Sequence, residues 1–234
     1  MKNYLLIFIV FVLSNCGKSE NIPKSFVETA LPKNESNEKR ELNYSKKEFS
    51  VEISEDNLKI DSVIHNRYSE LKIPNGTLKV KDNGEWGGKI EFISNDKNEK
   101  TVLIKEGNVK FIFQIGNKIY FIEGLAHMGI NGGELFELKY SRNNFSYKSI
   151  LKFEDCPEAI NIYNNKIYIV GYGNFYVVEN FKKKIIFENE FWSDLMPNSV
   201  AVINENEIYL GIRGGIVKLN ISNKNVLFYR YMKQ

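Results

Sequence analysis

Residues 160–173 read INIYNNKIYIVGYG, and this stretch decides the fold. Two segments rich in Ile, Tyr and Val flank Asn164 and Asn165, and a glycine-rich segment follows at 171–173. β-Branched and aromatic residues bounded by Asn and Gly are typical of β-strands joined by tight turns. The stretch therefore predicts a β-hairpin that is followed by a second turn.

The same pattern recurs on both sides of this hairpin. Residues 112–133 read IFQIGNKIYFIEGLAHMGINGG, and residues 200–215 read VAVINENEIYLGIRGG. Tyr120, Tyr168 and Tyr209 mark the equivalent position in each copy, at intervals of 48 and 41 residues. Two further apolar strands follow each glycine-rich segment, so each copy predicts a unit of four strands.

A fainter copy that begins at Gly76 extends the repeat over residues 71–230. Four strands in roughly 40 residues is the spacing of β-propeller blades, and the Asn-x-Ile-Tyr strand resembles the inner blade strands of propeller proteins. The resemblance implies an all-β fold, a small β-propeller-like array of about four four-stranded blades. A twisted β-sandwich and an open meander are the alternatives. Residues 49–53 and 58–64 predict two more strands, which would begin a fifth blade or cover an edge.

The start of the chain has a different character. Residues 1–14 read MKNYLLIFIVFVLS, with one lysine ahead of an apolar run that spans 4–13. Such a run is too short to cross a hydrocarbon core, which needs about 20 helical residues. A basic end, a short apolar stretch and a polar exit predict a signal peptide over residues 1–15, and therefore export.

Residues 13–17 read LSNCG and resemble the lipobox of bacterial lipoproteins. Leu13, Ser14 and Cys16 fit this motif, whereas Asn15 departs from the small residue that usually precedes the cysteine. The resemblance implies that Cys16 is lipidated and anchors the protein in the cell envelope, facing the periplasm or the exterior. Gly17 permits an outer-membrane location, which we expect in preference to the inner membrane. Plain secretory cleavage, with Cys16 unmodified, is the alternative.

Residues 16–47 predict a flexible tether between this cysteine and the repeat domain. The stretch is mostly Lys, Glu, Asn and Ser, it contains Pro23 and Pro32, and it has few aromatic residues. Such a composition buries too little apolar surface to offset the entropy lost on ordering. The predicted β-sheet domain therefore spans residues 48–234.

Charge and rare residues exclude several classes of function. The formal net charge is +3, and no concentrated basic face is visible, so we expect no nucleic acid partner. His127 and Met128 are adjacent and would diverge, and no Cys/His spacing accompanies them, so the sequence predicts neither a metal site nor a cofactor. Cys156 would have no disulfide partner if Cys16 is acylated.

Strand parity predicts one functional face. In an up-and-down meander, the turn between the second and third strands lies at the same end as the link to the next blade. This places the segments 84–88, 124–133, 155–157 and 189–198 together with Tyr172 and Arg213. Long loops with rare residues often carry the function of a scaffold. We therefore expect a binding surface formed by Glu85, Trp86, His127, Met128, Tyr172, Trp192 and Arg213. The alternative is that the tryptophans fill the central channel of the propeller and the glycines serve only the turns.

These observations favour a membrane-anchored binding module that engages a protein, a peptide or a glycan through this face. An extracytoplasmic hydrolase with a site on the same face is one alternative, and a toxin-neutralising or assembly lipoprotein is another. A nucleophilic set of His127, Cys156 and Asp155 is conceivable on the predicted face, but a cysteine before a proline in an apolar strand is more often inert.

Overall fold

The computed structural model describes residues 22–63, 68–141 and 144–233. The predicted signal peptide, the lipobox with Cys16, and His65 lie outside these ranges. The described chain is built from β-strands, with one short α-helix, α1 (Asn37–Tyr44), and one 3-10 turn, η1 (Gly84–Trp86), so the all-β prediction is confirmed. No helix among these residues is both long and apolar enough to span a membrane.

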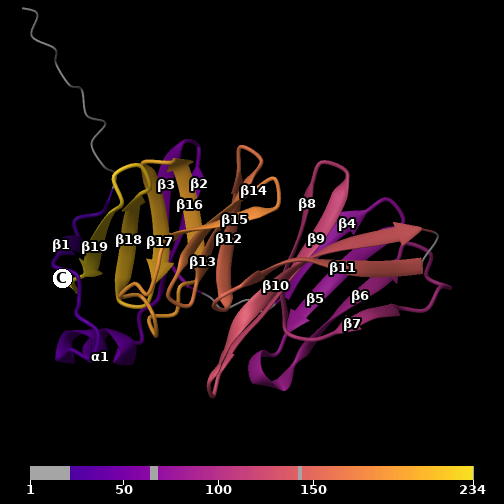
Figure 1. Ribbon diagram of the computed structural model, residues 1–234, viewed down its shortest axis with the longest axis horizontal. Coiled ribbons are helices and arrows are strands. Elements are labelled where there is room, and N and C mark those ends of the chain that lie inside the picture. Colours follow the sequence, from indigo (N-terminus) through magenta and orange to yellow (C-terminus); the bar gives the residue numbers. More distant parts are fainter. Residues whose placement is uncertain (1–21, 64–67, 142–143, 234) are drawn as a thin grey trace, which may run out of the picture.

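The strands form successive antiparallel sheets in chain order (Figure 1). The first sheet holds β4 (Tyr68–Ile73), β5 (Gly76–Asp82), β6 (Gly88–Ser94) and β7 (Val102–Glu106). The second holds β8 (Val109–Ile115), β9 (Lys118–His127), β10 (Ile130–Ser141) and β11 (Asn144–Phe153). The third holds β12 (Pro157–Tyr163), β13 (Lys166–Gly171), β14 (Phe175–Glu179) and β15 (Lys182–Phe187).

The fourth sheet has five strands, because an N-terminal strand joins its outer edge. It holds β16 (Ser199–Asn204), β17 (Glu207–Ile212), β18 (Gly215–Asn220), β19 (Asn225–Tyr231) and finally β1 (Phe26–Thr29). A separate hairpin of β2 (Phe49–Ser54) and β3 (Asn57–Ser62) packs on β16, β17 and β18. The two extra strands predicted from the sequence therefore cover the face of the last sheet.

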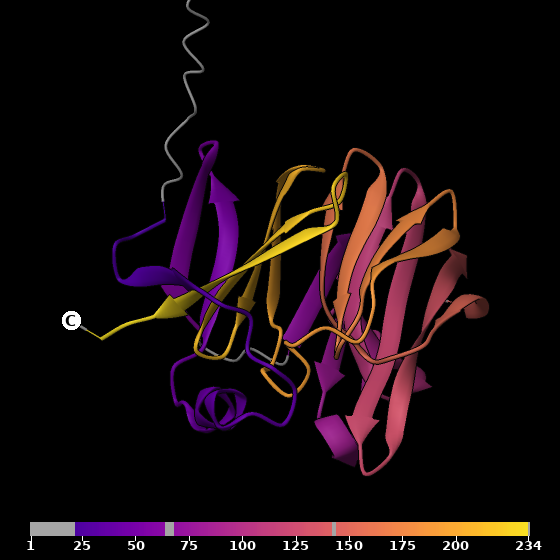
Figure 2. The ribbon, with the colours of Figure 1, turned by 60° about the vertical axis from the view of Figure 1, so that its left-hand side comes forward.

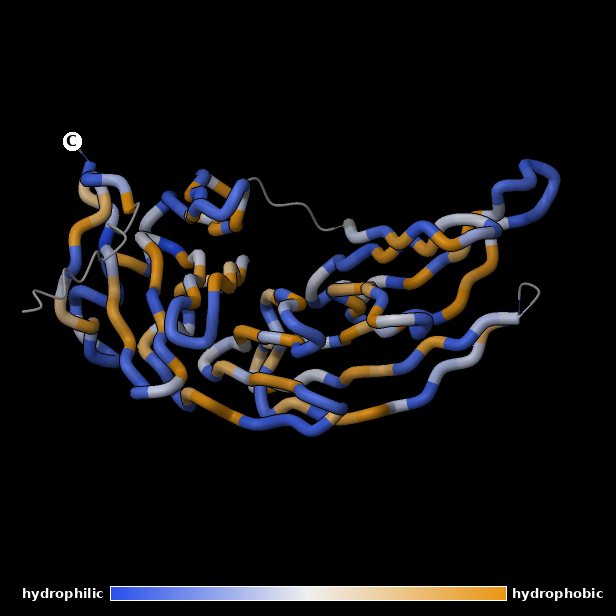
Figure 3. The backbone as a smooth tube through the Cα atoms, turned by 90° about the horizontal axis from the view of Figure 1, so that it is seen from above, coloured by the Kyte–Doolittle hydropathy of each residue, from blue (hydrophilic) through white to orange (hydrophobic). Residues whose placement is uncertain are grey.

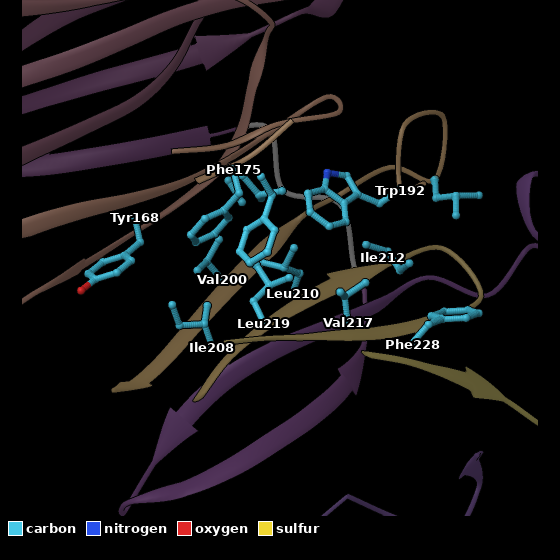
Figure 4. Close-up of a cluster of buried hydrophobic side chains, with 14 of the residues drawn as sticks. Tyr168, Phe175, Trp192, Val200, Ile208, Leu210, Ile212, Val217, Leu219 and Phe228 are labelled. Atoms are coloured by element: carbon cyan, nitrogen blue, oxygen red, sulfur yellow. The ribbon is translucent and has the colours of Figure 1, made fainter. Parts of the chain in front are cut away.

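Each pair of neighbouring sheets buries an apolar layer. The repeat tyrosines Tyr120, Tyr168 and Tyr209 are all fully buried in these layers, within β9, β13 and β17. Figure 4 shows the layer between the third and fourth sheets, where Phe175 of β14 lies near Val200 of β16 and Leu210 of β17. Because strand residues alternate between two faces, each inner sheet contributes one apolar face to each of its two neighbours.

Seen from above, the sheets follow one another along an open arc rather than a closed barrel (Figure 3). Contacts link β5 to β8, β9 to β12 and β12 to β16 in the order of the chain, and β16 then contacts β2 of the N-terminal hairpin. The propeller-like array of four-stranded sheets is therefore present in an open form.

The described part of the predicted tether is folded. Within residues 22–47, β1 pairs with β19 from Phe26↔Tyr231 to Thr29↔Phe228, and α1 follows with the Ser36 hydroxyl capping its first turn. The Phe26 ring lies 4.9 Å from that of Phe49 and 5.5 Å from that of Tyr231. The expectation of a flexible segment was wrong there, because composition reports local preferences, and the pairing partner lies at the other end of the chain.

The segment 124–133 is also not the long loop that its glycines suggested. β9 and β10 continue through it, paired from Gly133↔Gly124 to Ile130↔His127, and a two-residue turn of Met128 and Gly129 joins them. Both turn residues have positive φ, 47° and 84°, as a type I′ hairpin turn requires. The hairpin therefore projects as a two-stranded arm beyond β8 and β11.

Candidate binding surface

The loops predicted to share one face lie at one end of the sheets, together with α1 (Figures 1 and 2). Contacts connect them in sequence. The Cys156 amide donates to Asn131 Oδ1 over 2.8 Å, the Tyr172 hydroxyl hydrogen-bonds the Asp194 carboxylate, and the Arg213 amide donates to the Leu195 carbonyl over 2.6 Å. The deduction from strand parity is confirmed, and we call this end the loop edge (84–88, 124–133, 155–157, 172, 189–198 and 213).

The most exposed apolar side chains of the loop edge gather at one place. Trp86 in η1 is 83% exposed, and Met128 and Ile130 at the turn of the arm are 91% and 62% exposed. His127 Nε2 and Glu85 Oε2 lie 2.8 Å apart, and this contact, an ion pair when the imidazole is protonated, holds η1 against the arm. We call Trp86, Met128 and Ile130 the apolar tip.

The backbone at Met128 is unusual for its side chain. A left-handed conformation suits Gly, Asn or Asp and costs a residue such as Met about 1 kcal/mol. Met128 gains little in return, since nearly all of its side chain faces solvent. Strain of this kind is often retained for a functional reason.

An open groove of about 490 Å³ lies beside the apolar tip. Its floor is the base of the arm, residues 123–125 of β9 and 132–134 of β10. Lys105, Gly107 and Asn108 line one side, and Lys152 and Phe153 line the other. The Asn108 amide donates to the Gly84 carbonyl, so the first of these walls is joined to η1.

The groove carries two carboxylates side by side. Glu123 and Glu134 are direct cross-strand neighbours. Burial raises the pKa of Glu123, and the charge of Glu134 adds to this shift, whereas Lys105, with Nζ 3.0 Å from Glu123 Oε1, opposes it. Glu134 accepts a hydrogen bond from the Ser149 hydroxyl and lies opposite Lys152 in the register of β10 and β11. The two acids therefore occupy different environments within one groove.

Trp192 does not belong to this surface. Its side chain is fully buried, it packs 5.9 Å from the Phe191 ring, and its indole nitrogen has no hydrogen-bond partner among the described residues. Figure 4 places it at the edge of the core between the third and fourth sheets. The prediction of a surface role was wrong, because the segment 189–198 folds inward over that core.

Tyr172 and Arg213 lie on the loop edge but are occupied by contacts within the protein. Partial burial and the hydrogen bond to Asp194 raise the pKa of Tyr172 to about 12. The Arg213 guanidinium donates to Glu48 Oε1 over 2.6 and 2.9 Å and to the Asn43 carbonyl over 2.7 Å. Both side chains therefore join chain segments at this end. Arg213 links α1 and the residue that precedes β2 to the fourth sheet.

The residues His127, Cys156 and Asp155 do not form a nucleophilic set. Cys156 is fully buried, and desolvation raises the pKa of its thiol far above the ordinary value. Asp155 is buried and accepts hydrogen bonds from the amides of Gly173 and Asn174 and from the Tyr176 hydroxyl. His127 is paired with Glu85 instead. Asp155 and Cys156 therefore serve the structure.

Sequence reasoning missed the groove and Ile130. Glu123 and Glu134 stand 11 positions apart and become neighbours only through the register of β9 and β10. The two residues are equally far from the turn at Met128 and Gly129, so a prediction that placed the turn there would also have paired Glu123 with Glu134. Reading 124–133 as a loop concealed this relationship.

Of the residues expected on the binding surface, the structure brings together Glu85, Trp86, His127 and Met128, and it separates Trp192 from them. Comparison of the sequence with protein families finds no matching family model. Comparison with curated proteins finds no match either.

Proposed function

We propose that the protein is a binding module whose loop edge engages a protein, a peptide or a glycan. The observation that carries the proposal is the apolar tip, three large side chains that are mostly exposed and are held together by the Glu85–His127 ion pair. Isolated exposed apolar residues are common, whereas a group on two connected loops beside a groove is typical of binding surfaces. Trp is also enriched among the residues that dominate binding energies.

The module is proposed to act outside the cytoplasm, attached to a bacterial outer membrane through lipidated Cys16. Ile22, the first residue that the structure describes, lies six positions after Cys16. A fully extended chain of that length spans at most about 20 Å. The sheets would therefore stay close to the lipid headgroups, closer than a tether of the originally expected length would hold them.

The test is capture of surface partners from intact cells by the anchored protein and its variants. In Met128→Asn, the side chain of the tip is lost, and the left-handed turn is improved because Asn tolerates this conformation. Met196→Asn is the matched control, since Met196 is also exposed and also has positive φ but lies outside the apolar tip and the groove. We expect one specific partner to be lost with Met128→Asn and Trp86→Ala and kept with Met196→Asn. A partner set that is unchanged by all three would contradict the proposal.

A second function, hydrolysis at the same edge, is favoured by the Glu123–Glu134 pair. Two carboxyls that face one groove are the usual acid and nucleophile or base of glycoside hydrolysis. The test is release of reducing ends from oligosaccharides. Activity that is lost in both Glu123→Gln and Glu134→Gln would support hydrolysis, and saccharide that is bound without any cleavage would contradict it.

A further inference from the structure

The main chain that forms the floor of the groove beside the apolar tip is already hydrogen-bonded within its own sheet. Its residues belong to β9 and β10, the two inner strands of the second sheet, which pair with each other through Gly132↔Leu125 and Glu134↔Glu123. Addition of a peptide strand needs an unpaired sheet edge. A ligand on this floor must therefore be recognised mainly by side chains.

The groove is open because Gly132, the glycine of the floor whose Cβ position faces the groove, lacks a side chain. At Gly124 and Gly133, a Cβ would approach Pro157 to within 2.9 and 2.3 Å, so the opposite face of the arm is closed by the third sheet. At Gly132, a Cβ would meet only the Phe153 carbonyl, at 3.8 Å. A side chain at position 132 would occupy the groove without disturbing the fold.

The charges of the groove balance one another. Lys105 pairs with Glu123, and Lys152 lies opposite Glu134, whose carboxylate is also bound by the Ser149 hydroxyl. Two ammonium groups and two carboxylates offer strong donors and strong acceptors with no net charge. The carboxylates disfavour a phosphorylated or otherwise anionic ligand, and the lysines disfavour a cationic one.

We infer that this groove binds a neutral saccharide. A sugar hydroxyl is both donor and acceptor, so adjacent hydroxyls can satisfy a carboxylate and an ammonium together. Asn108 connects the groove to η1, where the exposed Trp86 ring offers a flat apolar surface to the C–H face of a further sugar unit. Charge balance, an occupied main chain and an adjacent exposed indole favour a saccharide over a peptide.

This inference rests on the proposed binding function of the loop edge and names the ligand of one part of it. The test is isothermal titration calorimetry of the full-length protein with four neutral hexasaccharides, namely cellohexaose, maltohexaose, mannohexaose and hexa-N-acetylchitohexaose. Gly132→Leu fills the groove, and Ser146→Leu is the matched control, a leucine added at an exposed position of β11 in the same sheet.

We expect at least one hexasaccharide to bind with a Kd below about 1 mM. Binding should be abolished in Gly132→Leu, weakened about tenfold or more in Glu134→Gln, where a charge-assisted hydrogen bond is lost, and unchanged in Ser146→Leu. Circular dichroism of each variant confirms folding. Equal binding by the wild type and Gly132→Leu, or binding of none of the four sugars, would overturn the inference.

The two proposals fail separately. If no sugar binds but partner capture still depends on Met128, the loop edge is a binding surface and only the saccharide assignment is wrong. If a sugar binds in the groove while capture is insensitive to Met128 and Trp86, the inference stands and the role of the apolar tip is wrong.

Discussion

His127 Nε2 lies 2.8 Å from Glu85 Oε2, and this ion pair joins η1 of the first sheet to the arm of the second. Both side chains are about 40% exposed, so the pair contributes little to global stability. Its effect is local, because it fixes the relative position of the loops that carry Trp86 and Met128.

Glu85→Gln should therefore loosen the apolar tip without unfolding the protein. We expect the free energy of unfolding to change by less than about 1 kcal/mol, as is usual for exposed ion pairs. Amide hydrogen exchange should become faster in residues 84–86 and 126–131 and stay unchanged in the third sheet. Uniformly faster exchange would show that the pair supports the whole fold instead.

The two tryptophans should respond in opposite ways to truncation. Trp192→Ala removes a fully buried side chain and should cost about 3–5 kcal/mol of unfolding free energy. Trp86→Ala removes an exposed one and should change stability by less than about 0.5 kcal/mol. Urea denaturation of both variants checks this difference, and a large loss in Trp86→Ala would contradict the exposed position of η1.

Asp155 should be important for stability rather than for activity. In Asp155→Asn, one oxygen becomes an amide nitrogen that faces the donors of Gly173, Asn174 or Tyr176. A buried donor left without an acceptor costs about 1–3 kcal/mol, so Asp155→Asn should be destabilised by at least that amount. The Tyr176 hydroxyl donates to Asp155 and accepts from the Asp155 amide and the Asn174 side chain, so Tyr176→Phe leaves two buried donors without this acceptor and should also be destabilised. Thermal unfolding of both proteins provides the comparison.

The carboxyl of Glu123 should make stability depend on pH. Its pKa is raised in the folded state, so the native protein holds this proton more tightly than the unfolded chain does. The stabilisation that this proton provides is complete below the pKa that Glu123 has in the unfolded chain. It is lost as pH rises through the higher pKa that Glu123 has in the folded protein. The wild type should therefore lose stability relative to Glu123→Gln as pH rises above about 4.3, and the difference should then level off. A difference that grows in favour of the wild type over this range would show that the Lys105 ion pair outweighs burial.

Arg213→Lys should release the N-terminal segment from the fourth sheet. A lysine keeps the charge but cannot bond Glu48 and Asn43 at once as the planar guanidinium does. We expect limited proteolysis to cut residues 37–48 sooner than in the wild type, with the sheets intact. Resistance equal to that of the wild type would show that Phe26 and Leu42 hold this segment without Arg213.

The parts of the fold that could be predicted are those encoded within one repeat. Ile, Tyr and Val between Asn or Gly turns report the local backbone, and the buried tyrosines Tyr120, Tyr168 and Tyr209 lie where the repeat places them. The shared position of the loops followed from strand parity alone. Neither argument needs contacts between distant residues.

The parts that could not be predicted depend on such contacts. Nothing near β1 indicates that its partner is β19, and the composition around it favours disorder. Trp86 and Trp192 both occur in irregular segments, and only packing against Phe191 and the third and fourth sheets separates the buried ring from the exposed one. Predicting the groove would have required the register of β9 and β10. That register is set by the turn at Met128 and Gly129, which was hard to recognise because Met, unlike Asn, is not typical of such turns.

The pairing of β1 with β19 has a consequence for the order of folding. β1 and β19 lie about 200 residues apart in the chain, so the outer edge of the fourth sheet is complete only when the two ends of the chain have come together. Until then β19 presents an unpaired edge, the kind of edge to which a second copy of the same strand could attach. By pairing with β19, β1 covers the edge at which strand exchange between neighbouring molecules could begin.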